Sequence, residues 1–233
     1  MPVPPGARMG PTRIGPKGWQ MSDKTTLYKD AAEKIAELRQ ALDGNAECGT
    51  NHYNLAVALM GVQQFAEAEQ ELYRAIDCSP TLAEAYAQLG GLRLREGDLD
   101  ACLDWNRRAV KARPGFSEGY GNIGFVELQK GNVDEAISAL EKAVHFNFRF
   151  VQALTTLANA YLMAGRVEDS IATNRRVIEL QPTFAVAHNN LAIAYLEQGD
   201  FAKAQEHMRL AEENGYAVAD PIRQEILAGI DGA

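Results

Sequence analysis

Few residues in this sequence have types and spacings that suggest catalysis. The segment Gly119–Gly124 matches the glycine pattern GxGxxG, but no strand pattern precedes it, and a phosphate-binding loop of this kind follows a strand. His52, His145, His188 and His207 show no spacing typical of metal ligands. No nucleophile lies beside a base in a defined context. The sequence therefore predicts no catalytic residues, no metal site and no cofactor.

Side-chain amides recur every 34 residues and suit another kind of chemistry, the recognition of a peptide backbone. Because an amide has both a donor and an acceptor, it can pair with both polar groups of one peptide unit. Neighbouring helices pack about 8–10 Å apart and an extended chain rises about 3.3 Å per residue, so one amide per helix would meet roughly every third residue of a bound peptide. The alternative is a solvated polar edge. The row consists of Asn54, Gln88, Asn122, Thr156 and Asn190.

Apolar residues form a second row with the same interval, beside the amides on a helical wheel. This line points away from the face that the helices need for their own packing, and such an apolar line suggests a binding groove. Each leucine covered by a partner would contribute roughly 1.5–3 kcal/mol. The alternative is that a neighbouring helix half covers the row. The row is Met60, Leu94, Leu128, Leu162 and Leu196, flanked by Val57, Phe125, Asn159, Ile193, Tyr53 and Asn189.

The elements that must position both rows are five copies of one 34-residue unit. With each copy numbered from 1 to 34, apolar residues at positions 4, 7, 8 and 11 lie on one helical face, and a second periodic run covers positions 17 to 28. Position 15 is glycine in four copies, which suits the left-handed residue that ends a helix. Each copy is therefore predicted to be a helical hairpin. The copies span residues 49–82, 83–116, 117–150, 151–184 and 185–218. The N-caps predicted at position 16 are Asp98, Asn132 and Asp200.

Position 32 closes the second helix, and the copies differ there. Proline, which bars the residue before it from helical geometry, is found in three copies as Pro80, Pro114 and Pro182. The third copy has Phe148 instead, which leaves the geometry between the third and fourth copies less certain, and the first copy has Gln63 in place of the turn glycine. Phe146, Phe148 and Phe150 cluster at the end of the third copy. We expect these rings to pack between repeats, and an exposed one would mark an interface.

The pattern of small, aromatic, glycine and proline positions resembles the tetratricopeptide repeat family, whose unit is a 34-residue helix–turn–helix. The resemblance covers residues 49–218. It implies an all-α fold, a right-handed α-solenoid of five tandem helix-turn-helix repeats whose first helices line the concave side. The amide row is similar to the asparagine ladder of O-linked N-acetylglucosamine transferases. The family's carboxylate clamp for acidic tails needs lysine or arginine at positions such as 2, 5 and 6, and this chain has neither there, so we reject a clamp.

The ends of the chain differ from the repeats. Residues 1–20 hold five of the nine prolines and no acidic residue, and they are predicted to form a disordered tail. Residues 22–48 are predicted to be an N-terminal capping helix or degenerate repeat, and residues 219–233 a C-terminal capping helix. A solenoid needs such caps because its terminal repeats would otherwise expose an apolar face. The stripe predicted on the first cap is Leu27, Ala31, Ile35, Leu38 and Leu42.

Composition excludes several classes of partner. A net charge of −8 argues against nucleic acid, because phosphate contacts need clustered lysine and arginine. No apolar run approaches the length of a membrane span, and no secretory signal is visible, which favours the cytoplasm. The three cysteines form no CxxC pair and are interpreted as reduced thiols. Arginine pairs at 107–108 and 175–176 suit an acidic partner or anionic lipid, so peripheral membrane association stays open; a solvated face is the alternative.

The leading hypothesis for function is a non-enzymatic adaptor that binds a peptide or helix of another protein in its concave groove. Replacement of Leu128 by aspartate is expected to abolish binding and leave the helices intact. A second hypothesis is a self-assembling scaffold, for example around a bacterial organelle or membrane complex, in which the basic arm 1–20 docks in the groove of the next molecule. Magnetosome-associated scaffolds of this family resemble that plan in architecture. A third is an accessory subunit of a separate enzyme.

Overall fold

The computed structural model describes the backbone of residues 21–231 and the side chains of residues 31–230, so the predicted tail lies outside the described residues. The described residues form twelve helices and no strand, which makes the protein an all-α solenoid. The helices are α1 (Met21–Gly44), α2 (Gly49–Gly61), α3 (Phe65–Cys78), α4 (Ala83–Arg95), α5 (Leu99–Ala112), α6 (Ser117–Gln129), α7 (Val133–Phe146), α8 (Val151–Met163), α9 (Val167–Leu180), α10 (Ala185–Glu197), α11 (Phe201–Glu213) and α12 (Asp220–Asp231).

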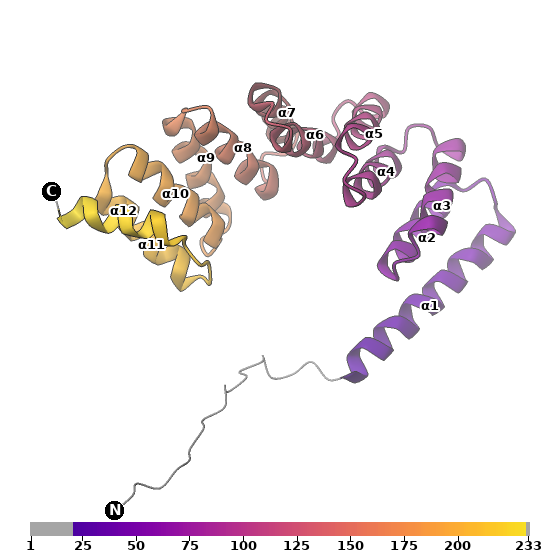
Figure 1. The fold of residues 1–233 in the computed structure, drawn as a ribbon. Coiled ribbons are helices and arrows are strands. Elements are labelled where there is room, and N and C mark those ends of the chain that lie inside the picture. The colour runs from indigo at the N-terminus through magenta and orange to yellow at the C-terminus, as the bar shows by residue number, and fades with distance from the viewer. Residues whose placement is uncertain (1–20, 232–233) are drawn as a thin grey trace, which may run out of the picture.

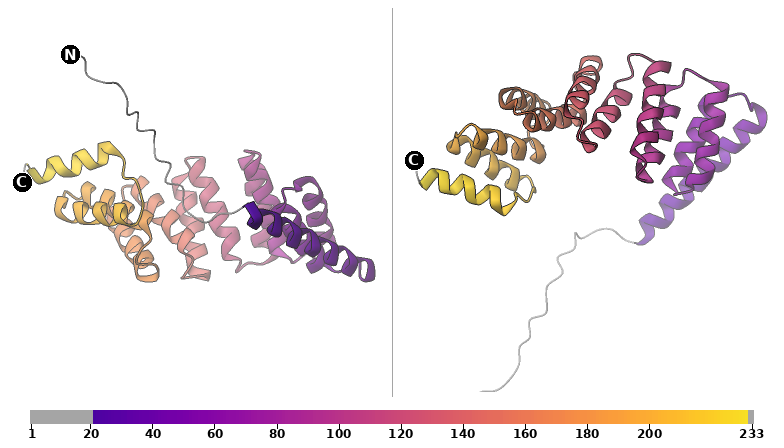
Figure 2. Two further views of the ribbon diagram at one scale, coloured as in Figure 1. Left: turned by 90° about the horizontal axis from the view of Figure 1, so that it is seen from below. Right: turned by 45° about the horizontal axis from the view of Figure 1, so that its top comes forward.

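The helices from α2 to α11 form five hairpins that follow one another along an arc, with α1 at one end and α12 at the other (Figure 1). Figure 2 shows the same row from two other sides. Each helix packs mainly on the next helix of the chain, and α4, α6, α8 and α10 also contact one another in succession. Since helices on the inside of an arc approach more closely than those outside, the first helix of each hairpin lines the inner face.

Glycine ends the first helix of four hairpins, as predicted. Gly97, Gly131, Gly165 and Gly199 have φ between +71° and +82°, a conformation that glycine adopts without steric conflict. Gln63 takes the same place in the first hairpin with φ of +64°, so the turn forms there at some backbone strain.

The N-cap prediction holds for two of its three residues. The carboxylates of Asp98 and Asp200 accept hydrogen bonds from the backbone amides of Ala101 (2.9 Å) and Lys203 (3.2 Å). Asn132 stands at the predicted N-cap position of α7, but its side chain makes no capping hydrogen bond and its amide nitrogen instead donates to Glu127 at 2.8 Å. Glu127, buried in the preceding helix, thus accepts from the Nδ2 donor of Asn132, and the Asn132 side-chain oxygen accepts no capping hydrogen bond from α7.

The missing proline at Phe148 does not alter the corner between repeats. Asn147, the residue before it, has φ −137° and ψ 90°. Arg113 and Gln181, which precede prolines at the same position of other repeats, have φ −140°, ψ 97° and φ −142°, ψ 87°. The chain thus leaves the second helix in one conformation whether or not proline follows.

Small residues at position 8 let the two helices of a hairpin approach closely. A Cβ atom on Gly124 would lie 2.4 Å from Cγ of Leu140, and one on Gly90 would lie 2.4 Å from Nδ2 of Asn106. Leu140 and Asn106 occupy the same position of their repeats and are fully buried or nearly so. The core is therefore a chain of such contacts along the row rather than one central cluster.

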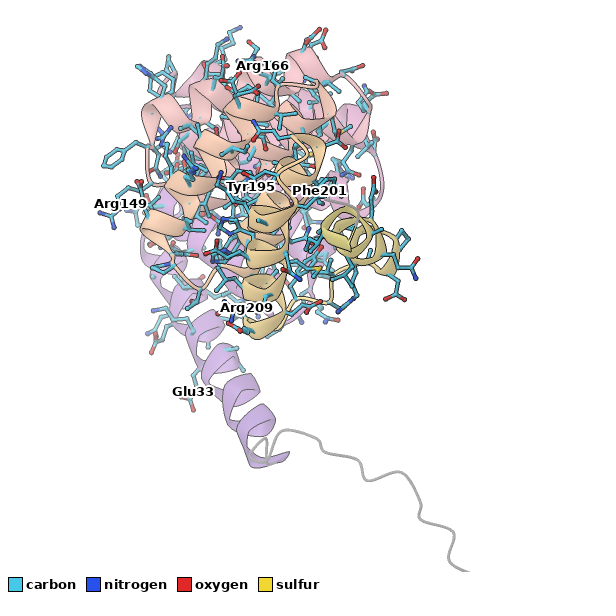
Figure 3. The ribbon with its side chains drawn as sticks, turned by 90° about the vertical axis from the view of Figure 1, so that its left-hand side faces the viewer. Glu33, Arg149, Arg166, Tyr195, Phe201 and Arg209 are labelled. Carbon is cyan, nitrogen blue, oxygen red and sulfur yellow. The ribbon has the colours of Figure 1, made fainter. Side chains whose placement is uncertain are left out.

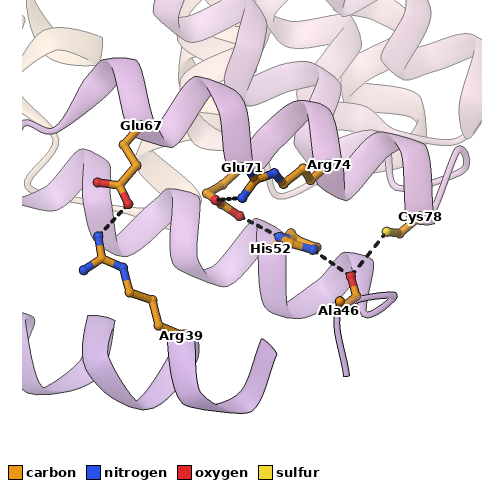
Figure 4. A network of polar contacts seen from close by, with 7 residues as sticks. All are labelled: Arg39, Ala46, His52, Glu67, Glu71, Arg74 and Cys78. Carbon is orange, nitrogen blue, oxygen red and sulfur yellow. Dashed lines mark hydrogen bonds and ion pairs between the residues drawn. The ribbon is translucent and has the colours of Figure 1, made fainter. Parts of the chain in front are cut away.

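The helices outside the five hairpins pack onto the ends of the row. Ile35 and Leu38 of α1 are buried in the cluster that contains Leu55 and Leu72. Ile226 of α12 is fully buried with Met208 of the last hairpin. An ion pair between Arg39 and Glu67 also joins α1 to α3 (Figure 4).

Candidate functional site

The five residues of the apolar row at position 12 differ in their exposure to solvent. Leu94 is 36% exposed, and Met60, Leu162 and Leu196 are half-buried. Leu128 is only 9% exposed because it belongs to the core cluster that contains Leu140. Leu128 therefore offers little surface to a partner, and its replacement by aspartate would disturb the core rather than test binding alone.

Two of the residues that flank this row expose apolar surface on the inner face. Val57 and Phe125, both at position 9, are 41% and 40% exposed, and Asn159 at the same position is also exposed. Ile193 and Tyr53 are half-buried, and Asn189 is buried at 6% exposure. The inner face is thus open along repeats 1 to 4 and more closed in repeat 5.

The amide row serves the stacking of repeats as well as facing solvent. Asn54 and Asn122 are exposed, Gln88 and Thr156 half-buried, and Asn190 is buried at 9% exposure.

Asn122 Nδ2 donates to Oδ1 of Asn106 in the preceding repeat at 2.9 Å. Thr156 Oγ1 donates to the Gln152 carbonyl at 2.9 Å. The groups of the amide row that remain available to bind a ligand are Asn54, Gln88 and the side-chain oxygen of Asn122.

A cavity of about 190 Å³ lies on the inner face between α6 and α8 and brings three of the predicted residues together. Phe150, in the corner between α7 and α8, closes one side of the cavity. Gly121 makes room for the Phe150 ring, since a Cβ atom on Gly121 would lie 2.9 Å from Phe150 Cε1. The lining residues are Gly121, Asn122, Phe125, Phe150, Gln152, Ala153 and Thr156, none of them charged. Sequence reasoning missed Phe150 as a lining residue, although aromatic residues recur at its position as Phe116 and Phe184.

Larger cavities lie between second helices on the outer side. One of about 510 Å³ is lined by residues that include Arg107, Tyr120, Glu127 and Lys142, and one of about 470 Å³ by residues that include Tyr73, Tyr86 and Trp105. Several polar groups of their walls already have partners within the protein. Arg107 pairs with Glu127, and the Arg108 guanidinium lies 4.5 Å from the centre of the Trp105 ring. Greater volume therefore does not make these cavities better candidates than the inner one.

A polar layer on the outer side ties each repeat to the next. In three pairs of neighbouring repeats, the residue at position 25 contacts the residue at position 11 of the next repeat. The contacts are Arg107 to Glu127 at 3.1 Å, Glu141 to the Tyr161 hydroxyl at 2.8 Å, and Arg175 to the Tyr195 hydroxyl at 2.6 Å. Burial, with the hydrogen bond to Glu141, raises the pKa of Tyr161 to about 12. Figure 3, which views the solenoid from its C-terminal end, shows Tyr195 among the helices rather than at the edge of the molecule.

Histidines at position 4 belong to the same layer. His52 Nδ1 lies 2.6 Å from the Glu71 carboxylate and its Nε2 lies 2.9 Å from the Ala46 carbonyl (Figure 4). In the last repeat, His188 Nδ1 lies 3.1 Å from Nδ1 of His207. Among the residues whose side chains are described, no group of three histidine, cysteine or acidic residues could hold a metal ion. We interpret these pairs as packing contacts.

Comparison with solved structures identifies the same fold in other proteins. PilF of Pseudomonas aeruginosa is similar with a TM-score of 0.72 at 16% identity, over 89% of this chain and 94% of that one. YrrB, described as a TPR protein with an unusual peptide-binding site, has a TM-score of 0.65 at 20% identity, over 83% and 97% of the two chains. MamA of Desulfovibrio magneticus RS-1 has 0.63 at 20% identity, over 71% and 94%.

The sequence itself matches a known repeat family. No curated protein matches the chain significantly. None of the helices described is long and apolar enough to cross a bilayer. Family models of the tetratricopeptide repeat match residues 30–83, 122–183 and 174–206, which together make up more than half of the chain. The chain therefore belongs to the tetratricopeptide repeat family, whose members are typically protein-interaction modules.

Proposed function

We propose that this protein is a non-enzymatic adaptor that binds an extended segment of a partner protein along its inner face. The observation that carries the proposal is the group of exposed apolar side chains on the first helices, Val57, Leu94 and Phe125. A protein surface that leaves such side chains in water along one face is typical of an interaction site. The peptide-binding site of YrrB, on a similar fold, supports the same use of the solenoid.

The cavity between α6 and α8 is the centre of the proposed site. It is bounded by Phe125 and Phe150 and is large enough for one apolar side chain of the partner. The amides of Asn122 and Gln152 lie at its rim and suit the backbone of the bound segment. Because no lining residue is charged, the partner residue that enters should be uncharged as well.

A selected peptide tests the proposal without knowledge of the natural partner. Peptides from a random displayed library would be selected on the intact protein, and their affinity measured by fluorescence anisotropy for the wild type and for Phe125→Asp. We expect the substitution to weaken binding by at least about tenfold, because it places a charge in an apolar cavity. Tyr73→Asp is the matched control, since Tyr73 is 41% exposed on the outer helix α3. Equal affinities for wild type and Phe125→Asp would contradict the proposal.

The self-assembling scaffold and the accessory subunit of an enzyme stay alternatives. The scaffold hypothesis predicts that light scattering detects large assemblies of the full chain, and that removal of residues 1–22 abolishes them. A strict monomer in both forms would remove the scaffold hypothesis and leave the adaptor.

A further inference from the structure

The corner between α7 and α8 exposes two phenylalanine rings. Phe148 is 66% exposed, the largest fraction among the large apolar side chains described, and Phe146 is 48% exposed. Phe150, the third ring of the predicted cluster, is half-buried at the inner cavity. The expectation that the rings pack between repeats is therefore wrong for Phe148, whereas Phe146 stacks on Tyr120 and leaves about half of its ring exposed.

The fold does not need a phenylalanine at this corner. Pro80, Pro114 and Pro182 occupy the position of Phe148 in three other repeats, where they are also exposed. The backbone before Phe148 already has the conformation found before those prolines. The ring is thus an apolar group added to a corner whose geometry is set without it.

The sequence segment that forms the corner carries only positive charges in a protein that is acidic overall. No aspartate or glutamate lies between Lys142 and Val167, although the chain has 31 acidic residues and a net charge of −8. Lys142 and Arg149 are exposed, and neither forms an ion pair with a carboxylate among the residues whose side chains are described. Glu141, the nearest acid in sequence before this segment, accepts the hydrogen bond of the Tyr161 hydroxyl.

Several cationic and aromatic groups at the end of α7 contact one another, and Phe148 and Arg149 follow them directly in the chain. The Lys142 ammonium lies 5.8 Å from the centre of the Tyr120 ring, which stacks on Phe146 with centroids 5.7 Å apart. The His145 ring meets Phe146 edge-on at 5.2 Å. Arg149 projects outward at one edge of the row (Figure 3). We call the group Lys142, His145, Phe146, Phe148 and Arg149 the phenylalanine corner.

We infer that the phenylalanine corner docks this protein on an anionic membrane surface. Phe146 and Phe148 would enter the interfacial region, and Lys142 and Arg149 would contact the phosphates of the headgroups. A bilayer suits this corner better than a protein partner does, because its most exposed ring protrudes. A protruding ring needs a partner that supplies a pocket, whereas lipid accepts it without one. The inner cavity, which Phe150 of the same corner closes, would then lie beside the membrane.

A substitution taken from the chain's own sequence provides the test. Phe148→Pro with Arg149→Thr converts Asn147-Phe-Arg-Phe150 into the arrangement of Gln181-Pro-Thr-Phe184. The structure shows no hydrogen bond from the amide of Phe148, so proline there removes none, and the Arg149 amide that donates to Asn147 is retained. The double variant should therefore fold like the wild type.

Cosedimentation with vesicles measures the effect. The wild-type chain should bind vesicles of phosphatidylcholine with roughly a third phosphatidylglycerol and not pure phosphatidylcholine. Its binding should weaken as salt is added. The double variant should lose at least about tenfold in affinity for the anionic vesicles. Arg149→Glu alone, at an exposed site, should show a loss in the same direction and covers the case in which the double variant fails to fold.

Leu227→Ser is the matched control, because Leu227 is 40% exposed on α12, away from the corner. Its binding should equal that of the wild type. The inference is overturned if the wild type does not bind anionic vesicles, if the double variant binds them equally well, or if Leu227→Ser loses as much. It is also overturned if the double variant changes only the sedimentation of the protein alone, which would make the corner a contact between copies of the chain.

Discussion

The inner and outer faces of this solenoid use their side chains in different ways. On the outer side, residues at the junctions contact the next repeat, as Arg107 contacts Glu127 and Arg175 contacts Tyr195. On the inner side, Val57, Leu94 and Phe125 are exposed on successive first helices. Most of the polar contacts between repeats described above lie on the outer side, so the exposed residues of the inner face can be replaced with little effect on the fold.

Helix α6 shows the contrast between the inner and outer faces at two nearby positions. Phe125 and Glu127 both belong to α6, but Phe125 is 40% exposed on the inner face and Glu127 is 5% exposed on the outer side. The Glu127 carboxylate accepts hydrogen bonds from Arg107 and Asn132. The two positions therefore offer a direct separation of binding from stability.

The largest effect should come from breaking the core that supports both faces. Leu140→Ala removes a fully buried side chain that packs against Gly124, and we expect a loss of about 2–5 kcal/mol in the free energy of unfolding. Urea unfolding followed by circular dichroism measures it. A loss below about 1 kcal/mol would show that the site collapses around the cavity and that the layer is less tightly packed than described.

The pair on α6 should separate the two faces. Phe125→Asp should leave the free energy of unfolding within about 0.5 kcal/mol of the wild type, as surface substitutions do, and abolish the binding of selected peptides. Glu127→Ala should lower the free energy of unfolding by about 1–2 kcal/mol through lost buried hydrogen bonds and leave peptide affinity unchanged. The contrast between the faces would fail if both variants lost binding to the same extent.

A smaller effect should come from the turn that joins an inner helix to an outer one. Gln63→Gly places at φ +64° the residue type found at this turn in the other four repeats, and we expect the protein to gain about 1 kcal/mol in stability. Thermal unfolding measures the gain, and peptide affinity should not change. Unaltered or reduced stability would mean that the freedom glycine adds to the unfolded chain outweighs the relieved strain.

The smallest effect should be a pH dependence confined to the outer side. Burial, and then the neighbouring His188, hold the pKa of His207 below its ordinary value, with Glu206 acting in the opposite sense and Arg175 in the same sense. The folded protein thus binds this proton less readily than the unfolded chain. Stability is full above the ordinary histidine pKa of about 6.5 and is lost as the pH falls below it.

Repeat 1 supplies the variant that checks this dependence. Glu71 stands at the position of His207 and contacts His52 at 2.6 Å. His207→Glu should therefore reduce the loss of stability on acidification, because the second positive charge is replaced by a negative one. Identical slopes of stability against pH between about pH 7 and about pH 5.5 for both proteins would rule out His207 as the source.

The periodicity of the sequence was sufficient to predict the helices and the face on which each residue lies. It could not predict exposure within a row. Leu94 and Leu128 share position 12, yet one is 36% and the other 9% exposed, because coverage depends on which side chains the next repeat presents. The hydrogen bond between Asn122 and Asn106 could not be predicted from the sequence either. It joins a first helix to the second helix of the preceding repeat, and the sequence pattern does not give the way in which two adjacent repeats stack.

Hydrogen–deuterium exchange of the intact protein with and without a selected peptide tests the inner binding face most directly. Bound peptide should slow exchange in α6 and α8, around Phe125 and Thr156, and in the adjacent corner at Phe150. Protection confined to the outer helices α5 and α7, around the cavity of Arg107 and Lys142, would contradict an inner binding face.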